Sequence, residues 1–370
     1  MFKYLLRYIS FLLFLLPAYL HAQEIPKPKG AVASGPANFL EEGNHKCDSA
    51  QVHLKNKDQK GSDKFYKEAV KDYKKAVKAN PASYVPLYRL GMALTKTKDY
   101  KKAIKSFNEA AAIDSTREVI YLERGKTYKE DGKTKEALKD FNKAVDLNFD
   151  DPAAVYQRGM LEERGNNMSA AFEDYARAIE LKPDFEDVYM QRGIVFFNVK
   201  KDFVLALIDF NKVIEINKAN TEAYMWRGRT KFNGGDFQGA DQDLSRYIDY
   251  EPQDINALIT RGASRININN NSGAVEDFDA VLELDPKNFI AYMNRGTAKG
   301  AMKKFKEGIK DLDMAIQLKF DYSTAYINRA AVKFASGDKK GACKDLTKAD
   351  GLNNEKAYEL IKKYCKEEER

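Results

Sequence analysis

The chain has 370 residues, of which 44% are hydrophobic and 32% are charged, and its formal net charge is +7. This composition is sufficient for a large buried core and excludes a chain too polar to fold. A net charge of this size is weak support for a nucleic-acid partner, because the distribution of charge matters more than its sum.

The first residues have the order of a secretory signal. Lys3 and Arg7 lie in a basic start, an apolar run covers residues 9–20, and Ala22 offers a small residue before a cleavage point. We predict a signal peptide over residues 1–22, so that the protein is exported to the periplasm or the cell exterior. The alternative is an uncleaved anchor, but about 12 apolar residues fall short of the roughly 20 that a membrane span needs. The mature chain is not expected to span a membrane.

Small residues recur along most of the chain at an interval of 34 residues, with one interval of 35. In the second half of each repeat, a large apolar residue follows a second small residue by one helical turn. Two helices cross closely only where small side chains let their backbones approach, and a large side chain fills the space beside them. The pattern therefore predicts stacked helical hairpins. The first small residues are Gly91, Gly125, Gly159, Gly193, Gly228, Gly262, Gly296 and Ala330, and the large residues are Phe107, Phe141, Tyr175, Phe210, Leu244, Phe278, Leu312 and Leu346.

One repeat shows the complete pattern of small and aromatic residues. It carries Tyr121, Gly125, Tyr128, Ala137 and Phe141, and in this order the chain resembles the tetratricopeptide-repeat family. The resemblance implies an all-α fold, a right-handed superhelical solenoid of helix-turn-helix units with a C-terminal capping helix. It also implies that ligands are protein or peptide segments bound along the concave surface formed by the first helix of each repeat.

The repeats divide the chain into five predicted segments. A signal peptide over residues 1–22 precedes a flexible leader over 23–49, which is rich in proline and glycine. A degenerate repeat covers 50–83, because Ala69, Tyr73 and Pro81 are kept while the first helix is degraded. Eight repeats cover 84–354, and residues 355–370 are expected to form the capping helix.

Seven repeats carry an arginine directly before the first small residue and an aspartate in the second helix. The midpoint between Arg124 and Asp140 is Gly132, in the expected turn, so the two side chains should lie level across the hairpin. The repeat over 84–117 has Leu90 and Ser106 at these two places, so both partners are lost together. We interpret the pairs as structural; the alternative is a row of arginines that binds a polyanion. The pairs are Arg124 with Asp140, Arg158 with Asp174, Arg192 with Asp209, Arg227 with Asp243, Arg261 with Asp277, Arg295 with Asp311, and Arg329 with Asp345.

A second stripe of the first helices is left to face the groove. It mixes side-chain amides, which suit an extended peptide backbone because each is both donor and acceptor, with Met and aromatic residues. Trp226 is the only tryptophan, and it is either a binding hot spot or a core residue. The predicted groove residues are Tyr88, Tyr156, Gln157, Met190, Gln191, Ile194, Phe197, Asn198, Met225, Trp226, Arg229, Phe232, Asn233, Asn267, Asn294, Asn328 and Phe334.

Cysteines and histidines give little sign of catalysis or metal binding. Hairpin arithmetic places Cys343 opposite Cys365, so we predict a possible disulfide between them, with Cys47 unpaired. His45, Cys47 and His53 could be written as a metal cluster, but a fourth ligand is missing. We therefore expect no enzyme, no metal and no cofactor.

These observations predict a non-catalytic adaptor or scaffold that binds a protein or peptide segment in its groove, in cell-envelope assembly or secretion. The alternative is a protein that binds cell-wall material or a polyanion through its basic N-terminal repeats, since residues 55–110 hold 15 basic and 6 acidic side chains. No nucleic-acid partner is expected. The sequence leaves the oligomeric state open.

Overall fold

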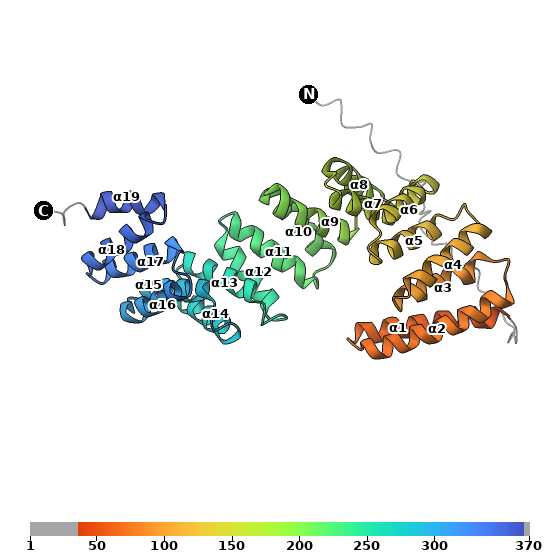
Figure 1. The fold of residues 1–370 in the computed structure, drawn as a ribbon, viewed down its shortest axis with the longest axis horizontal. Helices are drawn as coiled ribbons and strands as arrows, with labels where there is room; N and C mark the ends of the chain where they lie inside the picture. Colours follow the sequence, from red (N-terminus) through yellow and green to blue (C-terminus); the bar gives the residue numbers. More distant parts are fainter. Residues whose placement is uncertain (1–35, 366–370) are drawn as a thin grey trace, which may run out of the picture. The chain divides into compact units, whose positions relative to one another are not determined.

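The computed structural model describes residues 36–365, and these residues form helices joined by short turns (Figure 1). The signal peptide predicted for residues 1–22 and residues 23–35 of the predicted leader lie outside the described part. Contacts divide the chain into an N-terminal unit that ends at Leu147 and a C-terminal unit that begins at Asn148. Within residues 36–365 there is no strand, and no helix is both long and apolar enough to cross a membrane.

The helices of each unit follow one another as antiparallel pairs. The N-terminal unit contains α1 (Pro36–Lys55), α2 (Gln59–Ala79), α3 (Tyr84–Lys96), α4 (Tyr100–Ile113), α5 (Glu118–Glu130) and α6 (Thr134–Leu147). The C-terminal unit contains α7 (Pro152–Arg164), α8 (Met168–Leu181), α9 (Glu186–Val195), the π-helix η1 (Phe196–Lys200), α10 (Phe203–Ile216), α11 (Thr221–Asn233), α12 (Phe237–Ile248), α13 (Ile255–Asn267), α14 (Asn271–Leu284), α15 (Phe289–Ala301), α16 (Phe305–Leu318), α17 (Ser323–Ala335), α18 (Lys339–Asp350) and α19 (Glu355–Tyr364).

The turn inside each hairpin is short because one residue adopts a left-handed backbone. Gly132 and Gly235 have φ of 77° and 83°, and Lys98 takes the same conformation at 61°. In several hairpins the next helix then starts on a polar cap; Asp99, for example, accepts a hydrogen bond from the backbone N–H of Lys102. A left-handed residue followed by a cap reverses the chain within a few residues, so the two helices of a repeat must pack against each other.

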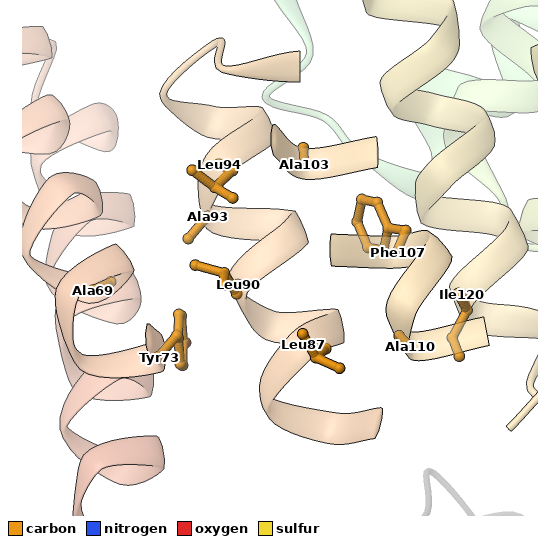
Figure 2. Close-up of a cluster of buried hydrophobic side chains, with 10 residues drawn as sticks. All are labelled: Ala69, Tyr73, Leu87, Leu90, Ala93, Leu94, Ala103, Phe107, Ala110 and Ile120. Carbon is orange, nitrogen blue, oxygen red and sulfur yellow. The ribbon is translucent and has the colours of Figure 1, made fainter. Parts of the chain in front are cut away.

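Each hairpin closes where a small residue, which is a glycine in all but the last hairpin, faces a large apolar side chain. A Cβ atom added at Gly91 would lie 2.7 Å from the ring of Phe107, and one at Gly125 would lie 2.6 Å from Phe141. These distances leave no room for a side chain, which explains the small residue at this place. Phe107 belongs to a buried cluster that joins α2, α3, α4 and α5 (Figure 2). The predicted all-α solenoid of helical hairpins is therefore confirmed.

The first hairpin is longer than the others and begins earlier than the sequence indicated. Residues 36–49, assigned above to a flexible leader, lie in α1, which packs along α2. Gly43 faces Tyr73 as Gly91 faces Phe107, but 30 residues separate the first pair and 16 the second. The additional 14 residues are about two helical turns in each helix. The boundary predicted at residue 50 is thus wrong, because the longer first hairpin does not follow the 34-residue interval.

The repeat with one additional residue is also distinctive. Its first helix ends in η1, a π-helix that accommodates the insertion. On the outer face of α10, Val204, Leu205 and Ile208 are 72%, 41% and 57% exposed. The same three places in α4 are all lysines, and in α16 they are lysine, glutamate and lysine.

The C-terminal unit ends on a covalently attached helix. Helix α19 packs on α18, and Cys343 of α18 is bonded to Cys365 at an S–S distance of 2.02 Å. Cys365, Ala330, Ala342 and Leu346 belong to one buried cluster. Helix α19 therefore covers the apolar face that the last hairpin would otherwise expose.

Candidate functional site

The first helices of the N-terminal unit form a cavity, referred to below as the N-terminal cavity. Its volume is about 330 Å³. Its walls come from three successive first helices, α1, α3 and α5, and from α2. This is the surface on which the family resemblance places ligands. The lining residues are Asn44, Cys47, Asp48, Gln51, Tyr66, Tyr73, Arg89, Met92, Ala93, Thr95, Lys96, Glu123, Lys126 and Glu130.

Most polar groups on the floor of the N-terminal cavity are hydrogen-bonded within the protein. Tyr73 is buried, and its hydroxyl donates to Asn44 Oδ1 at 2.9 Å. Thr95 Oγ1 donates to the carbonyl of Gly91 at 3.0 Å and lies 2.8 Å from Thr127 Oγ1, which joins α3 to α5. Burial raises the pKa of the Tyr66 hydroxyl, so this group is neutral. Hydrogen bonds therefore join α1 to α2 and α3 to α5 at the cavity floor.

The charged side chains that line the N-terminal cavity lie at different depths. Asp48, Lys96 and Glu130 are exposed to solvent at its edge. Lys126 and Glu123 are half-buried and form an ion pair at 2.6 Å. Arg89 is half-buried and, among residues 36–365, has no carboxylate within ion-pair distance. The lining as a whole holds three basic and three acidic side chains, and Arg89 is the half-buried one without an ion-pair partner within residues 36–365.

Sequence reasoning placed most of the binding surface in the C-terminal unit, where several of its residues belong to the core. Tyr156 is only 8% exposed because it packs against Tyr175 and Phe185. Phe197 is 6% exposed because the π-helix turns it toward Phe203. These two assignments to the groove surface are corrected.

Trp226 is neither fully buried, as a core residue would be, nor fully exposed. Its ring stacks on buried Phe210 with 6.2 Å between centroids and meets Phe197 edge-on at 5.5 Å. Its Nε1 donates to Glu222 at 3.2 Å, and the guanidinium of Arg229 lies 4.9 Å from the ring. The tryptophan is half-buried, so one face covers the core while part of the ring stays accessible.

The predicted row of amides is partly used within the chain. Gln191 donates to Glu163 at 2.9 Å, and Asn328 donates to Thr297 at 3.2 Å, so both link neighbouring first helices. Asn233 and Asn267 donate to carbonyls of their own helices at 2.8 Å. These contacts leave fewer groups for a ligand than the sequence suggested. Of the other predicted residues, Asn198 is exposed, and Tyr88, Gln157, Met190, Ile194, Met225, Arg229, Phe232, Asn294 and Phe334 are half-buried.

Each arginine of the seven predicted pairs contacts its aspartate. Arg124 makes two bonds of 2.7 Å to Asp140, through Nε and Nη2. The remaining nitrogen of the same guanidinium donates to Asn108 of the preceding repeat at 2.7 Å, a contact that the sequence analysis missed. The distances in the other pairs are 2.6 Å for Arg158–Asp174, 2.7 Å for Arg192–Asp209, 2.7 Å for Arg227–Asp243, 2.6 Å for Arg261–Asp277, 2.7 Å for Arg295–Asp311 and 2.5 Å for Arg329–Asp345.

The aspartates of these pairs are buried, and burial disfavours their charged form. Burial raises the pKa of Asp277, and the guanidinium of Arg261 opposes that rise. The same two effects act on Asp209 and Arg192. Since the guanidinium donors are directed at these carboxylates, they are not presented to a polyanion. The geometry favours the structural interpretation of the pairs.

Three segments of the chain match models of the tetratricopeptide repeat, at residues 85–117, 122–184 and 222–254. No curated protein sequence matches the chain. Similar solved structures include PilF of Pseudomonas aeruginosa, with 15% identity, a TM-score of 0.48, and coverage of 58% of this chain and 94% of that one. Another is the Cut9–Hcn1 hetero-tetramer of the APC/C, with 14% identity, a TM-score of 0.45, and coverage of 86% and 75%.

A MamA double mutant from RS-1 is 20% identical, with a TM-score of 0.42 and coverage of 45% of this chain and 94% of that one. At such identities the likeness concerns the fold alone. The repeat models match parts of both units. The chain therefore contains tetratricopeptide repeats.

Proposed function

We propose that this protein is a non-catalytic adaptor that binds a segment of another protein along the first-helix surface of its repeats. The N-terminal cavity is the observation that carries the proposal. Side chains from three successive first helices line it, so a segment lying across α1, α3 and α5 would contact all of them. A preformed concave site with a few convergent polar groups is the usual form of a binding site.

The proposal includes the place where the adaptor acts. The order of basic, apolar and small residues in 1–22 supports export, and an exported scaffold fits a role in envelope assembly or secretion. Cell fractionation and N-terminal sequencing test this part. A mature chain beginning at Gln23 in the periplasm or medium supports export, whereas a cytoplasmic protein that retains Met1 contradicts it.

The alternative of cell-wall or polyanion binding has less support. Its basic residues in α2 and α4 are spread over exposed positions, and several are already paired, such as Lys102 with Asp99 at 2.6 Å. Each of the seven arginines of the predicted pairs forms an ion pair with its own aspartate.

Site-specific photo-cross-linking in the producing cell tests the binding surface. One variant carries the cross-linking amino acid at Met92, which lines the N-terminal cavity, and the matched control carries it at Lys105, an exposed residue of α4. We expect discrete protein adducts from Met92 and none of the same mass from Lys105. Identical adducts from both positions, or none from Met92, would contradict the proposal.

A further inference from the structure

The polar groups of the N-terminal cavity, as well as its shape, favour a particular kind of ligand. Its interior offers hydrogen-bond donors that the protein itself leaves unused. Tyr66 is 5% exposed, lines the cavity, and its hydroxyl has no hydrogen-bond partner among residues 36–365. The hydroxyl is accessible from the cavity, so a ligand bound there can accept its hydrogen bond.

Two further donors face the same space. The Oδ1 of Asn44 accepts from Tyr73, and its amide N–H groups have no partner within residues 36–365. The guanidinium of Arg89 contacts only the ring of Tyr88, at 5.8 Å, in that part of the chain. Arg89 stands two residues before Gly91, a place that holds an amide or hydroxyl residue in several other repeats, such as Gln157, Gln191 and Asn294.

Acceptors below the edge of the cavity are, by contrast, engaged. The carboxylate of Glu123 is paired with Lys126. The sulfur of Cys47 lies 3.5 Å from the Tyr73 hydroxyl, and Thr95 is satisfied by Gly91 and Thr127. A ligand group that accepts several hydrogen bonds and carries negative charge would pair with Arg89 and with the two donors. A carboxylate meets both requirements, and a guanidinium binds it through two parallel bonds.

We propose that the N-terminal cavity binds an acidic side chain of the partner protein, with Arg89 as its ion-pair partner and Tyr66 and Asn44 as hydrogen-bond donors. Met92, Ala93 and Cys47 contact the methylene groups of that side chain. The exposed charges of Asp48, Lys96 and Glu130 stay solvated at the edge and act on the flanking residues. This inference rests on the proposed adaptor function and names the chemistry that the adaptor recognises.

Immobilised peptide pools test the inference by biolayer interferometry with the full mature protein. Two pools of acetylated, amidated heptapeptides have random neutral flanks and carry either Glu or Gln at the centre. A third pool has no acidic side chain but ends in a free carboxylate. We expect the Glu pool to bind at least fivefold more tightly than the Gln pool and the free-carboxylate pool.

Three variants assign the preference to residues. Arg89→Gln should abolish the preference for Glu, and Tyr66→Phe, which keeps the ring, should reduce it by about threefold. Lys96→Gln is the matched control, because it removes a charge at the edge of the same cavity and should leave the preference within twofold of the native protein. Circular dichroism and thermal unfolding verify that each variant is folded.

The outcomes separate the inference from the proposed function. Equal binding of the Glu and Gln pools, or loss of preference in Lys96→Gln but not in Arg89→Gln, overturns the inference. If the free-carboxylate pool binds best, the recognised group is a terminal carboxylate and not a side chain, and the inference is overturned. If no pool binds, the inference also fails, whereas the proposed function is decided separately by cross-linking from Met92 to the cell's own partner.

Discussion

The two units use the same hairpin but stabilise it differently. All six hairpins of the C-terminal unit carry the arginine–aspartate pair, and its last helix is held by a disulfide. In the N-terminal unit only α5–α6 carries that pair. Asp72 of the first hairpin is paired with Lys46, and the second hairpin has Leu90 and Ser106 instead.

The hairpin α3–α4 shows that the ion pair is not required for the fold. Gly91 contacts Phe107 there just as Gly262 contacts Phe278 in a hairpin with a full pair. Leu90 is buried, and Ser106 donates to the carbonyl of Lys102 in its own helix. The close contact of a small residue with a large one therefore defines the hairpin, and the ion pair is an addition.

The largest expected effect comes from the contact that both units share. Phe107→Ala and Phe278→Ala each remove a fully buried ring, and each should lower the free energy of unfolding of its region by about 3–5 kcal/mol. Urea unfolding and hydrogen exchange of the affected hairpins measure this loss. A cost at Phe107 far below that at Phe278 would contradict the shared role of this contact, because α3–α4 would then be stabilised mainly by other contacts.

The next effect concerns the buried pair. Asp277→Ser leaves Arg261 without its main carboxylate and should cost about 3–5 kcal/mol. The double change Arg261→Leu with Asp277→Ser gives these two positions the residues of α3–α4. Arg265 keeps Asp241 as a partner, so the double change should cost clearly less than the single change. Urea unfolding of the two variants gives this difference. A double variant that is as unstable as the single one would mean that the C-terminal unit cannot do without its pairs.

The disulfide has a smaller and local effect. Changing both Cys343 and Cys365 to Ser should destabilise the end of the C-terminal unit by about 3 kcal/mol, since the bridge closes a loop of roughly 20 residues. Hydrogen exchange should increase in α18 and α19 and remain unchanged in α7 and α8. Equal exchange in native and variant proteins would show that α19 is held by packing alone.

The smallest effect concerns Cys47 in the N-terminal unit. Burial raises the pKa of its thiol, and the hydrogen bond from Tyr73 only partly opposes this. Less thiolate is then present at pH 8, so alkylation should be several-fold slower than in the denatured, non-reduced chain. Mass spectrometry after iodoacetamide treatment measures the rate. Reaction as fast as in the denatured chain would show that the packing of α1 on α2 does not cover this thiol.

Much of the fold was predictable because it repeats. The 34-residue interval, the arginine–aspartate partners and the placing of Cys343 opposite Cys365 all follow from hairpin geometry applied to residue numbers. Helix α1 escaped this reasoning because Gly43 lies outside the interval, although Asp72 and Tyr73 have the same order as Asp140 and Phe141. A search for that pair of residues with a free spacing could have found the longer hairpin.

The binding surface was harder to predict than the hairpins. A helical stripe shows which side chains share a face of one helix, but it could not show that Tyr156 and Phe197 are turned into the core. The N-terminal cavity also depends on residues from α1 and α2 that the sequence assigned to a leader and a degenerate repeat. Whether a donor such as Tyr66 finds a partner is decided by three helices together, so no pattern within one helix reveals it.

The central claim is that the arginine–aspartate pairs serve structure while the N-terminal cavity serves binding. The most direct test measures cross-linking from Met92 in the native background and in the double variant Arg124→Leu with Asp140→Ser. We expect the yield of the adduct to stay within twofold, because the variant carries the residues that α3–α4 already tolerates. A yield that falls to the level of the Lys105 control, in a variant that remains folded, would contradict the claim.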